Sequence, residues 1–231
     1  MSSTNRSLNR VNEYGTPPEC VRLLTARLSI DYGLSNRHRI LEPQAGSGSI
    51  LRALRDDTLF YDSHVTAIEV NPEHRGALSS VADKVIIHDF LDVEPPADLN
   101  KLFDLVIGNP PYGRPTFDTA GTVRLGTKGQ PIQEDAVTDH VEHGLRMLKP
   151  DGLLVYLLRW AWIVPTVRST LNRHPIHAYP LRKRPSFLLD GVPKGSDSTE
   201  YAWFVWGGTE VNVRFAAARA SAPAAFLSTP I

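Results

Sequence analysis

Four consecutive residues, Asn109, Pro110, Pro111 and Tyr112, have the clearest potential for chemistry in this chain. They directly follow the apolar run at 105–108, so they stand where a buried strand is expected to end. An amide, carbonyl oxygens and two prolines without N–H groups form a stiff set of hydrogen-bond acceptors beside an aromatic ring. Such a set is suited to holding a flat, weakly nucleophilic amino group still while an electrophile approaches it.

A second candidate is the turn at 42–49, which reads Glu-Pro-Gln-Ala-Gly-Ser-Gly-Ser between an expected strand and a helix opening near Ile50. Gly46 and Gly48 allow a tight turn whose backbone can lie against a ligand. Glu42 argues against a phosphate at this turn, so a cationic or hydroxyl-bearing ligand fits better.

Acidic residues also follow the next two expected strands. Glu69 and Val70 stand where doubly wound folds place a carboxylate that binds ribose hydroxyls. Asp89 and Phe90 offer a carboxylate for an exocyclic amine and a ring for stacking. Each feature alone is more often a plain turn, a helix cap or a solvated charge. Their succession at consecutive strand ends favours one shared ligand site, because ligands of open α/β sheets bind at those ends.

The elements that must position these residues alternate between apolar strands and helices. This pattern predicts an α/β fold with a doubly wound, seven-stranded, mostly parallel, Rossmann-like sheet and helices on both faces. Strands are expected near 38–41, 64–68, 84–87, 102–107, 153–158, 176–180 and 201–206.

Two helices carry clear signals. Thr16 is the predicted N-cap of the first, with Pro17 at the first helical position and Glu19 completing a capping box. The apolar residues expected to line its buried face are Val21, Leu24 and Leu28. A second helix is expected to carry Val137, Val141, Leu145 and Leu148 and to stop at 149–152.

Composition limits the organisation and the partners. With 231 residues, 42% of them hydrophobic, the chain can bury one good core. We expect one domain over 1–207, with small loops at 113–130 and 180–199, and a partly disordered extension over 208–231. Lys plus Arg equals Asp plus Glu at 25 each, so contact with a polyanion requires local basic patches.

Cysteine and histidine usage predicts no metal site. Cys20 is the single cysteine, which excludes an internal disulfide, and the eight histidines show no paired metal-ligand spacing. The sequence shows no signal peptide and no apolar run near 18 residues, so a reducing cytoplasm without membrane contact is the expected setting.

Together these motifs resemble class I S-adenosylmethionine-dependent methyltransferases, and specifically the N6-adenine DNA methyltransferases with an Asn-Pro-Pro-Tyr motif, such as those of phages and prophages. The likeness covers roughly Tyr14 to Trp206 and implies S-adenosyl-L-methionine as cofactor and DNA as partner, in a bacterial or phage-infected cell. The catalytic residues that it implies are Asn109, Pro110, Pro111 and Tyr112. The cofactor-binding residues that it implies are Tyr14, Thr16, Pro17, Glu42, Pro43, Ala45, Gly46, Gly48, Glu69, Val70, Asp89, Phe90 and Asn109.

The resemblance also suggests a mechanism. The N6 lone pair of adenine is delocalised into the ring, so N6 attacks a sulfonium methyl group poorly. The Asn109 side-chain oxygen and the Pro110 carbonyl are expected to accept both N6 hydrogens and to aim the lone pair at the methyl group. Tyr112 is expected to stack on the base, which is worth about 1–3 kcal/mol. A base in a duplex would first have to be flipped out.

Two loops are the candidates for nucleic-acid contact. The loop at 113–130 follows the catalytic motif and is expected to be a mobile flap, and the loop at 180–199 interleaves basic and aromatic residues. A solvated charged hairpin is the alternative for the second loop. The contact residues proposed are Arg114, Arg124, Lys128, Arg182, Lys183, Arg184, Phe187 and Lys194. The four tryptophans are expected in the core or at a sheet edge.

Three other functions stay open at this point. They are an RNA adenine-N6 methyltransferase, a protein glutamine methyltransferase that shares the motif, and a non-catalytic fold that binds nucleic acid or another subunit. The roughly 37 residues before the first expected strand leave little room for the helical substrate domain of the glutamine enzymes. The intact Asn109 and glycine turn argue against a non-catalytic role. A monomer and a homodimer both remain open.

Overall fold

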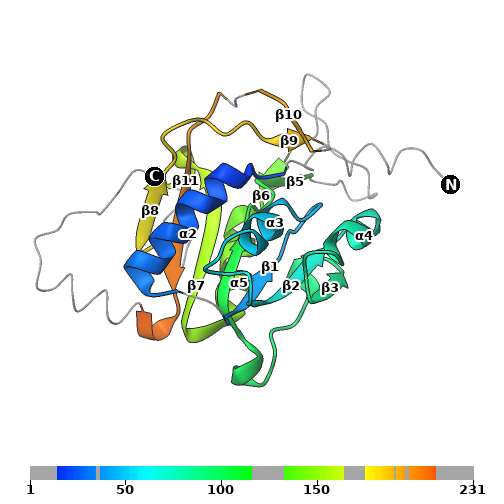
Figure 1. Cartoon of the computed structure of the whole chain (residues 1–231), viewed down its shortest axis with the longest axis vertical. Helices are drawn as coiled ribbons and strands as arrows, with labels where there is room; N and C mark the ends of the chain where they lie inside the picture. Colours follow the sequence, from blue (N-terminus) through cyan, green and yellow to red (C-terminus); the bar gives the residue numbers. More distant parts are fainter. Residues whose placement is uncertain are drawn as a thin grey trace, which may run out of the picture.

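The computed structural model describes residues 15–34, 37–115, 133–163, 175–189, 191–195 and 198–211, which form a central sheet with helices on both faces (Figure 1). The sheet has seven strands in the order β3-β2-β1-β4-β7-β11-β8. These strands are β1 (Arg39–Glu42), β2 (His64–Glu69), β3 (Lys84–Ile87), β4 (Phe103–Gly108), β7 (Leu148–Arg159), β8 (His177–Pro180) and β11 (Tyr201–Gly207). Neighbours from β3 to β7 are parallel, and β11 is antiparallel to both β7 and β8. The predicted fold class is confirmed.

Each face of the sheet buries its own apolar cluster, because alternate residues of a strand point to opposite faces. Ile40 packs in one cluster with residues of α2 (Pro18–Tyr32), α3 (Ser49–Arg55) and α4 (Arg75–Leu78). Leu41 packs in the other cluster with residues of α5 (Val137–Arg146). The residues predicted to line the first helix, Val21, Leu24 and Leu28, are completely buried.

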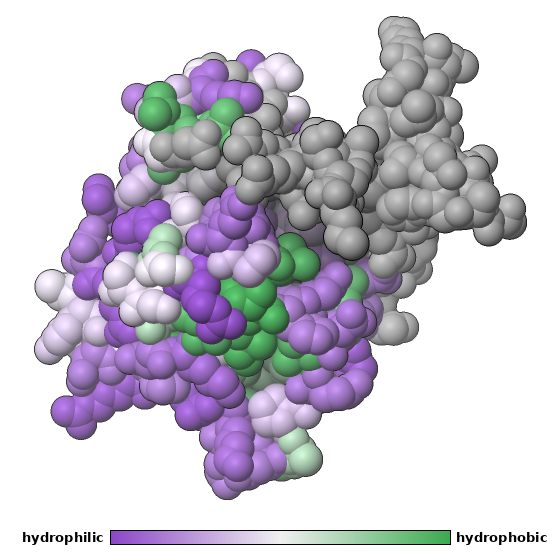
Figure 2. Space-filling model, turned by 90° about the vertical axis from the view of Figure 1, so that its right-hand side faces the viewer, coloured by the Kyte–Doolittle hydropathy of each residue, from purple (hydrophilic) through white to green (hydrophobic). Residues whose placement is uncertain are grey.

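The segments before and after β3 contain only short helices. Between β2 and β3 the chain forms η2 (Pro72–His74) and the four-residue α4. Between β3 and β4 it forms only the 3₁₀ turns η3 (Phe90–Asp92) and η4 (Leu99–Lys101). Figure 2 faces the side on which β3 and α4 lie in Figure 1 and shows apolar residues in the middle of a polar surface.

The predicted capping box at Thr16 is wrong. The first helix begins at Pro18, Pro17 occupies the N-cap position, and no side chain caps the helix. The Thr16 hydroxyl instead lies 3.4 Å from the side-chain nitrogen of Asn109, which donates to it. A contact between residues far apart in the sequence therefore uses the oxygen that a local cap would need.

The predicted end of the second helix is also wrong. The helix α5 ends at Arg146, and Leu148 already belongs to β7, where it pairs with Phe103 of β4. The residues expected to stop the helix, 149–152, lie inside β7. Gly152 permits this path, because a Cβ atom there would lie 2.7 Å from the Phe103 carbonyl oxygen.

The tryptophans lie where the sequence predicts them. Trp203 and Trp206 on β11 are completely buried, and Trp160 and Trp162 of η5 (Trp160–Ile163) pack against the α5-side cluster. The Trp203 indole N–H donates to the Cys20 carbonyl oxygen at 3.1 Å, so the buried polar atom is satisfied.

Two small hairpins complete the described structure and lie at the upper end of the molecule in Figure 1. One pairs β5 (Gly113–Pro115) with β6 (Gln133–Asp135), and the other pairs β9 (Leu188–Leu189) with β10 (Val192–Pro193). The expected flap therefore starts in β5, and its part from 116 to 130 lies outside the described residues, as does the C-terminal extension from 212 onward.

Two features are absent from the described residues. No helix among them is long and apolar enough to cross a membrane. No group of three or more His, Cys, Asp or Glu side chains in this part of the chain could hold a metal ion.

Candidate functional site

The predicted site residues converge at the carboxyl edge of the sheet because β3, β2, β1 and β4 are parallel neighbours. Direct contacts join the turns that follow these strands. The Ala45 N–H donates to the Ile68 carbonyl oxygen at 3.0 Å, and the His88 N–H donates to the Glu69 carbonyl oxygen at 3.0 Å. The structure thus brings the glycine turn and both acidic strand ends together.

Glu69 is held by the backbone of two turns. Its carboxylate accepts from the Gly46 N–H at 2.7 Å and from the Asn71 N–H at 2.8 Å, and only 9% of the residue is exposed. A carboxylate offers about four acceptor positions, so two remain for hydroxyl groups of a ligand. The neighbouring Val70 is 66% exposed at the same edge.

The glycine turn has the conformation that its sequence predicts. Gly46 and Gly48 have φ angles of 51° and 87°, which side chains rarely adopt. A Cβ atom on Gly48 would also lie 3.1 Å from the Leu78 side chain. Pro43 and Ala45 are buried within the turn, and α3 starts directly after it at Ser49.

Glu42 is a buried carboxylate at the end of β1. It is 2% exposed, and its Oε2 atom has no hydrogen-bond partner among the described residues. Burial, and then the charge of Glu69, raise the pKa of Glu42 well above its ordinary value. A buried carboxylate with an unsatisfied oxygen is costly unless a cation or a donor completes it. This atom therefore favours a ligand that carries a positive or hydrogen-donating group.

The third strand end is only partly as predicted. Asp89 is exposed, and its carboxylate accepts from the Leu91 N–H at 3.0 Å, so it caps η3. The Phe90 ring is 3% exposed and packs edge-on against His143 of α5, with ring centroids 4.5 Å apart. The ring is thus enclosed by α5 in this structure, and the exposed polar group at this strand end is the Asp89 carboxylate.

The tetrapeptide after β4 has an ordered hydrogen-bond pattern. The Tyr112 hydroxyl lies 2.9 Å from Asn109 Oδ1 and 3.1 Å from the Leu157 carbonyl oxygen, both of which can accept its proton. The Asn109 side-chain nitrogen points to the Thr16 hydroxyl. These contacts fix the amide so that Oδ1 lies on the Tyr112 side. An amide oxygen has two lone pairs, so it can accept a second hydrogen bond.

The segment before the first helix is tied to the second loop by its backbone. The N–H and carbonyl of Gly15 exchange hydrogen bonds with those of Leu188 at 2.8 and 2.9 Å. A Cβ atom on Gly15 would lie 3.3 Å from the Ser49 hydroxyl, so the strand passes close to the start of α3. Thr16 and Pro17 are therefore held beside Asn109, while Tyr14 lies outside the described residues.

Aromatic and basic side chains surround Tyr112. Its ring meets that of Tyr201 edge-on at 6.2 Å, and Tyr201 in turn meets Phe187 at 5.1 Å. The Arg159 guanidinium lies over the Tyr112 ring, 4.8 Å from its centroid. Arg159 was missed in the sequence analysis, although it ends the apolar strand β7. A polar residue at the end of an apolar strand was the signal that identified the other candidate residues.

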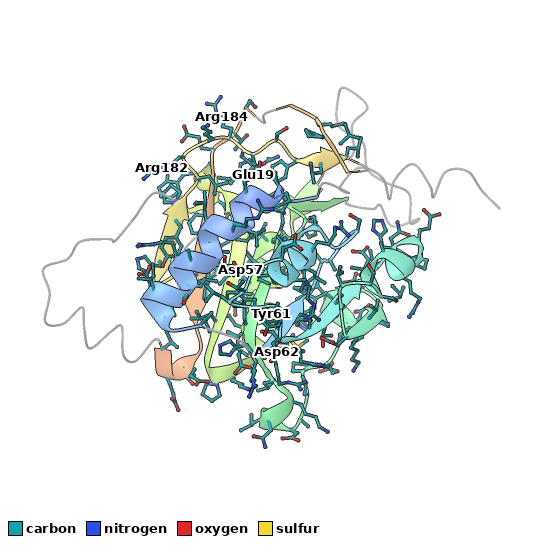
Figure 3. The ribbon with its side chains drawn as sticks, in the orientation of Figure 1. Glu19, Asp57, Tyr61, Asp62, Arg182 and Arg184 are labelled. Atoms are coloured by element: carbon teal, nitrogen blue, oxygen red, sulfur yellow. The ribbon has the colours of Figure 1, made fainter. Side chains whose placement is uncertain are left out.

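The predicted nucleic-acid residues divide into three groups. Arg182, Lys183, Arg184 and Lys194 are exposed, and Figure 3 shows Arg182 and Arg184 at the upper end of the molecule. Phe187 is only 9% exposed, and its packing against Tyr201 argues against the predicted wedge or stacking role. Arg114 lies in β5 with its side chain outside the description, and Arg124 and Lys128 lie outside the described residues altogether.

Known proteins are similar to this chain in sequence. The family model described as Eco57I restriction-modification methylase matches residues 54–176, more than half of the chain. The type II methyltransferase M.TthHB8I of Thermus thermophilus is 28% identical over 178 residues. The match covers 71% of this chain but only 37% of that protein.

Solved structures share the fold. A Listeria monocytogenes protein described as a class I S-adenosylmethionine-dependent methyltransferase is similar with a TM-score of 0.65 and 17% identity, over 96% of this chain and 67% of that one. The methyltransferase subunit of a type I restriction-modification system from Streptococcus thermophilus is similar with a TM-score of 0.61 and 19% identity, over 85% of this chain and 45% of that one. At these identities the likeness concerns the fold.

Proposed function

Because the chain belongs to the Eco57I restriction-modification methylase family, we propose that it transfers a methyl group from S-adenosylmethionine to the N6 amino group of adenine in DNA. The observation that carries the proposal is the position of Asn109. Its fixed amide lies at the end of β4, the strand next to β1, whose glycine turn holds an unsatisfied buried carboxylate. An acceptor for an amino group thus follows the strand next to a buried carboxylate that is suited to a cationic ligand.

The residues of the glycine turn fit S-adenosylmethionine. Glu42 Oε2 would accept from the ammonium group of the methionine part and would then be satisfied. Glu69 keeps acceptor positions for the ribose hydroxyls, and the exposed Asp89 can accept from the adenine amine. When bound, the cofactor supplies an electrophilic methyl group on a positively charged sulfur.

The acceptors around the target amine would do the catalytic work. Asn109 Oδ1 accepts one N6 hydrogen while it keeps its bond to the Tyr112 hydroxyl, and the Pro110 carbonyl is the proposed acceptor of the other. Both bonds localise the N6 lone pair and strengthen as positive charge develops on the nitrogen. Tyr112 contributes a ring for stacking, and its hydroxyl keeps the Asn109 amide in place.

Access for the base requires that adenine leave the duplex. Flipping costs a few kcal/mol, which contacts to the strand must offset. The exposed Arg182, Lys183 and Arg184 at the carboxyl edge are suited to phosphate contact. The partners proposed are therefore duplex DNA and the cofactor, and the flap at 113–130 and the loop at 180–199 would set the recognition sequence.

The test is methyl transfer from tritiated S-adenosylmethionine to three substrates offered separately: genomic DNA free of N6-methyladenine, structured RNA and a release factor. We expect label in DNA, and mass spectrometry of the digested nucleosides should identify N6-methyldeoxyadenosine. Label only in RNA or only in the release factor would replace the proposal with the corresponding alternative. Label in none of the three, from protein that binds the cofactor, would favour a binding module.

A further inference from the structure

Arg159 has a position that the proposed chemistry does not yet explain. It is the last residue of β7, its side chain is exposed, and its guanidinium lies 4.8 Å from the centre of the Tyr112 ring. The ring is the surface on which the target base is proposed to stack. A cation over an aromatic face is attracted by the ring's electrons, and the attraction at an exposed site is weak enough for a ligand to displace it.

The strands explain how Arg159 reaches this ring. Gly108, the last residue of β4, pairs with Tyr156, so β7 continues beyond the end of β4. Leu157 and Arg159 point to the same face because side chains alternate along a strand. The Tyr112 hydroxyl contacts the Leu157 carbonyl oxygen, which places the ring alongside this extension. The fold itself therefore holds Arg159 beside the catalytic motif.

Arg159 also lies near the basic residues at 182–184. It pairs with Tyr201 of β11, and on the other side of β11 the Tyr201 carbonyl oxygen accepts from the Leu181 N–H. Adjacent strands lie about 4.8 Å apart, so Arg159 and the residue after Leu181, which is Arg182, start roughly 10 Å apart at the same edge. Lys183 and Arg184 follow Arg182 in the chain, and all three are exposed.

We propose that Arg159 binds a phosphate group that flanks the flipped nucleotide and vacates the Tyr112 ring for the target base. The inference rests on the proposed function. A flipped base remains attached to its sugar and phosphates, so a base on Tyr112 brings a phosphate to the mouth of the pocket. The planar guanidinium binds a phosphate oxygen pair with two parallel hydrogen bonds. The exchange is non-covalent: stacking of the base replaces the contact between cation and ring.

A purely structural role for Arg159 makes a different prediction. If the guanidinium only positioned the Tyr112 ring, its removal would lower the rate of methyl transfer at saturating DNA. Removal of a phosphate contact instead weakens DNA binding and makes it less dependent on salt, because each phosphate neutralised releases counterions. A structural role therefore predicts a change in the rate of methyl transfer, whereas a phosphate contact predicts a change in DNA affinity and in its salt dependence.

The experiment uses the full chain and duplex DNA that carries its target sequence, which methylation-sensitive sequencing of genomic DNA treated with the protein maps. Binding is measured against salt for the wild type, Arg159→Ala, Arg159→Gln and the control Arg37→Ala. Arg37 is an exposed arginine at the amino end of β1, and its partner Asp62 lies in the lower part of Figure 3, away from Arg182 and Arg184. Each flanking phosphate is then replaced in turn by an uncharged methylphosphonate.

We expect Arg159→Ala to weaken binding about tenfold near physiological salt and to make the slope of log affinity against log salt shallower by about 0.9, with turnover at saturating DNA within about threefold of wild type. One methylphosphonate should weaken wild-type binding but not that of the variant. An unchanged slope, or variant and methylphosphonate effects that simply add, would overturn the inference.

Arg159→Gln repeats the comparison if the alanine variant fails to fold, because it keeps the polar side chain without the charge. Cofactor binding should be unchanged in both variants. Failure of the proposed function is visible separately, since wild-type protein would then methylate no DNA and no site could be mapped.

Discussion

The two halves of the carboxyl edge are built by different means. At the ends of β1 and β2, polar groups are fixed by backbone hydrogen bonds within and between neighbouring turns, as with Glu69 and the Gly46 and Asn71 N–H groups. Near the ends of β7 and β8 and the start of β11, side chains from distant parts of the sequence meet, as do Tyr112, Tyr201 and Phe187.

The difference corresponds to what each half is proposed to bind. A single small molecule of constant shape is well served by backbone groups that cannot move far, because preorganisation lowers the cost of binding. A polymer read at a short site needs exposed side chains that contact phosphates and bases. Asn109 lies between the two halves of the edge, because its side chain is hydrogen-bonded to Thr16 on one side and to Tyr112 on the other.

The largest effect should come from a change at Asn109. Asn109→Ala removes the amide oxygen that is proposed to accept from N6, so turnover should fall by about 100-fold or more while cofactor affinity stays within about threefold. Methyl-transfer kinetics and calorimetric titration with the cofactor measure the two quantities. Asn100→Ala, on η4 at the opposite edge, is the matched control. Retention of more than about a tenth of the rate would contradict the acceptor role.

The next largest effect should come from Glu42→Gln, which should weaken cofactor binding. It removes the proposed partner of the cofactor's ammonium group, and a hydrogen bond to a charged group is worth about 1.5–3 kcal/mol, so cofactor affinity should fall about 10- to 100-fold. Glu73→Gln, an exposed residue of η2, is the control. Unchanged affinity would show that Glu42 does not contact the cofactor.

The same substitution should stabilise the cofactor-free protein at neutral pH. The pKa of Glu42 is raised, so its contribution to stability is full below its ordinary value of 4.5 and is lost as pH rises through the raised pKa. The glutamine variant does not lose it and should be more stable by on the order of 1 kcal/mol at neutral pH, with the difference shrinking toward pH 4.5. Urea unfolding across pH measures this, and equal stability throughout would contradict it.

Replacing Arg182, Lys183 and Arg184 together by alanine should change DNA binding and leave cofactor binding as it is. The slope of log affinity against log salt should become shallower by about two to three, and cofactor affinity should not change. Replacing Arg37, Lys84 and Lys101, which are exposed at the amino ends of the strands, removes the same charge as a control. Equal slopes for the two triple variants would assign the basic loop to the alternative of a solvated hairpin.

The smallest effect should follow Phe187→Leu. Because Phe187 packs under Tyr201, the substitution should lower the free energy of unfolding by about 1 kcal/mol and leave DNA affinity unchanged. Unfolding in urea and DNA titration provide the two measurements. A loss of DNA affinity without a loss of stability would restore the wedge role that the sequence predicts.

The strand ends of the cofactor half were predictable because their signals are local. The expected strand at 84–87 matches β3, the one at 64–68 stops one residue before the end of β2, and the one at 102–107 is shifted by one residue from β4. Continuous apolar runs identify buried parallel strands, and a turn directly after such a run lies at the carboxyl edge whatever the rest of the chain does.

The structure departs from the sequence-based expectations where residues distant in the sequence contact the same group. The Thr16 hydroxyl fits a capping box until Asn109 approaches it, and the rings of Phe90 and Phe187 suit stacking until His143 and Tyr201 cover them. Tertiary packing overrides a local preference of about 1 kcal/mol, such as a helix cap.

Because β11 runs antiparallel to β8, insertions between these two strands need not disturb the sheet. The chain leaves β8 and enters β11 at the same edge, so the segment 181–200 starts and finishes about one strand spacing apart. Insertions there cost little loop-closure entropy and leave the register of the sheet alone, with Leu188 anchored to Gly15. Insertions on either side of Leu188 would therefore change the side chains exposed at this edge, while the pairing of Leu188 with Gly15 keeps Thr16 beside Asn109.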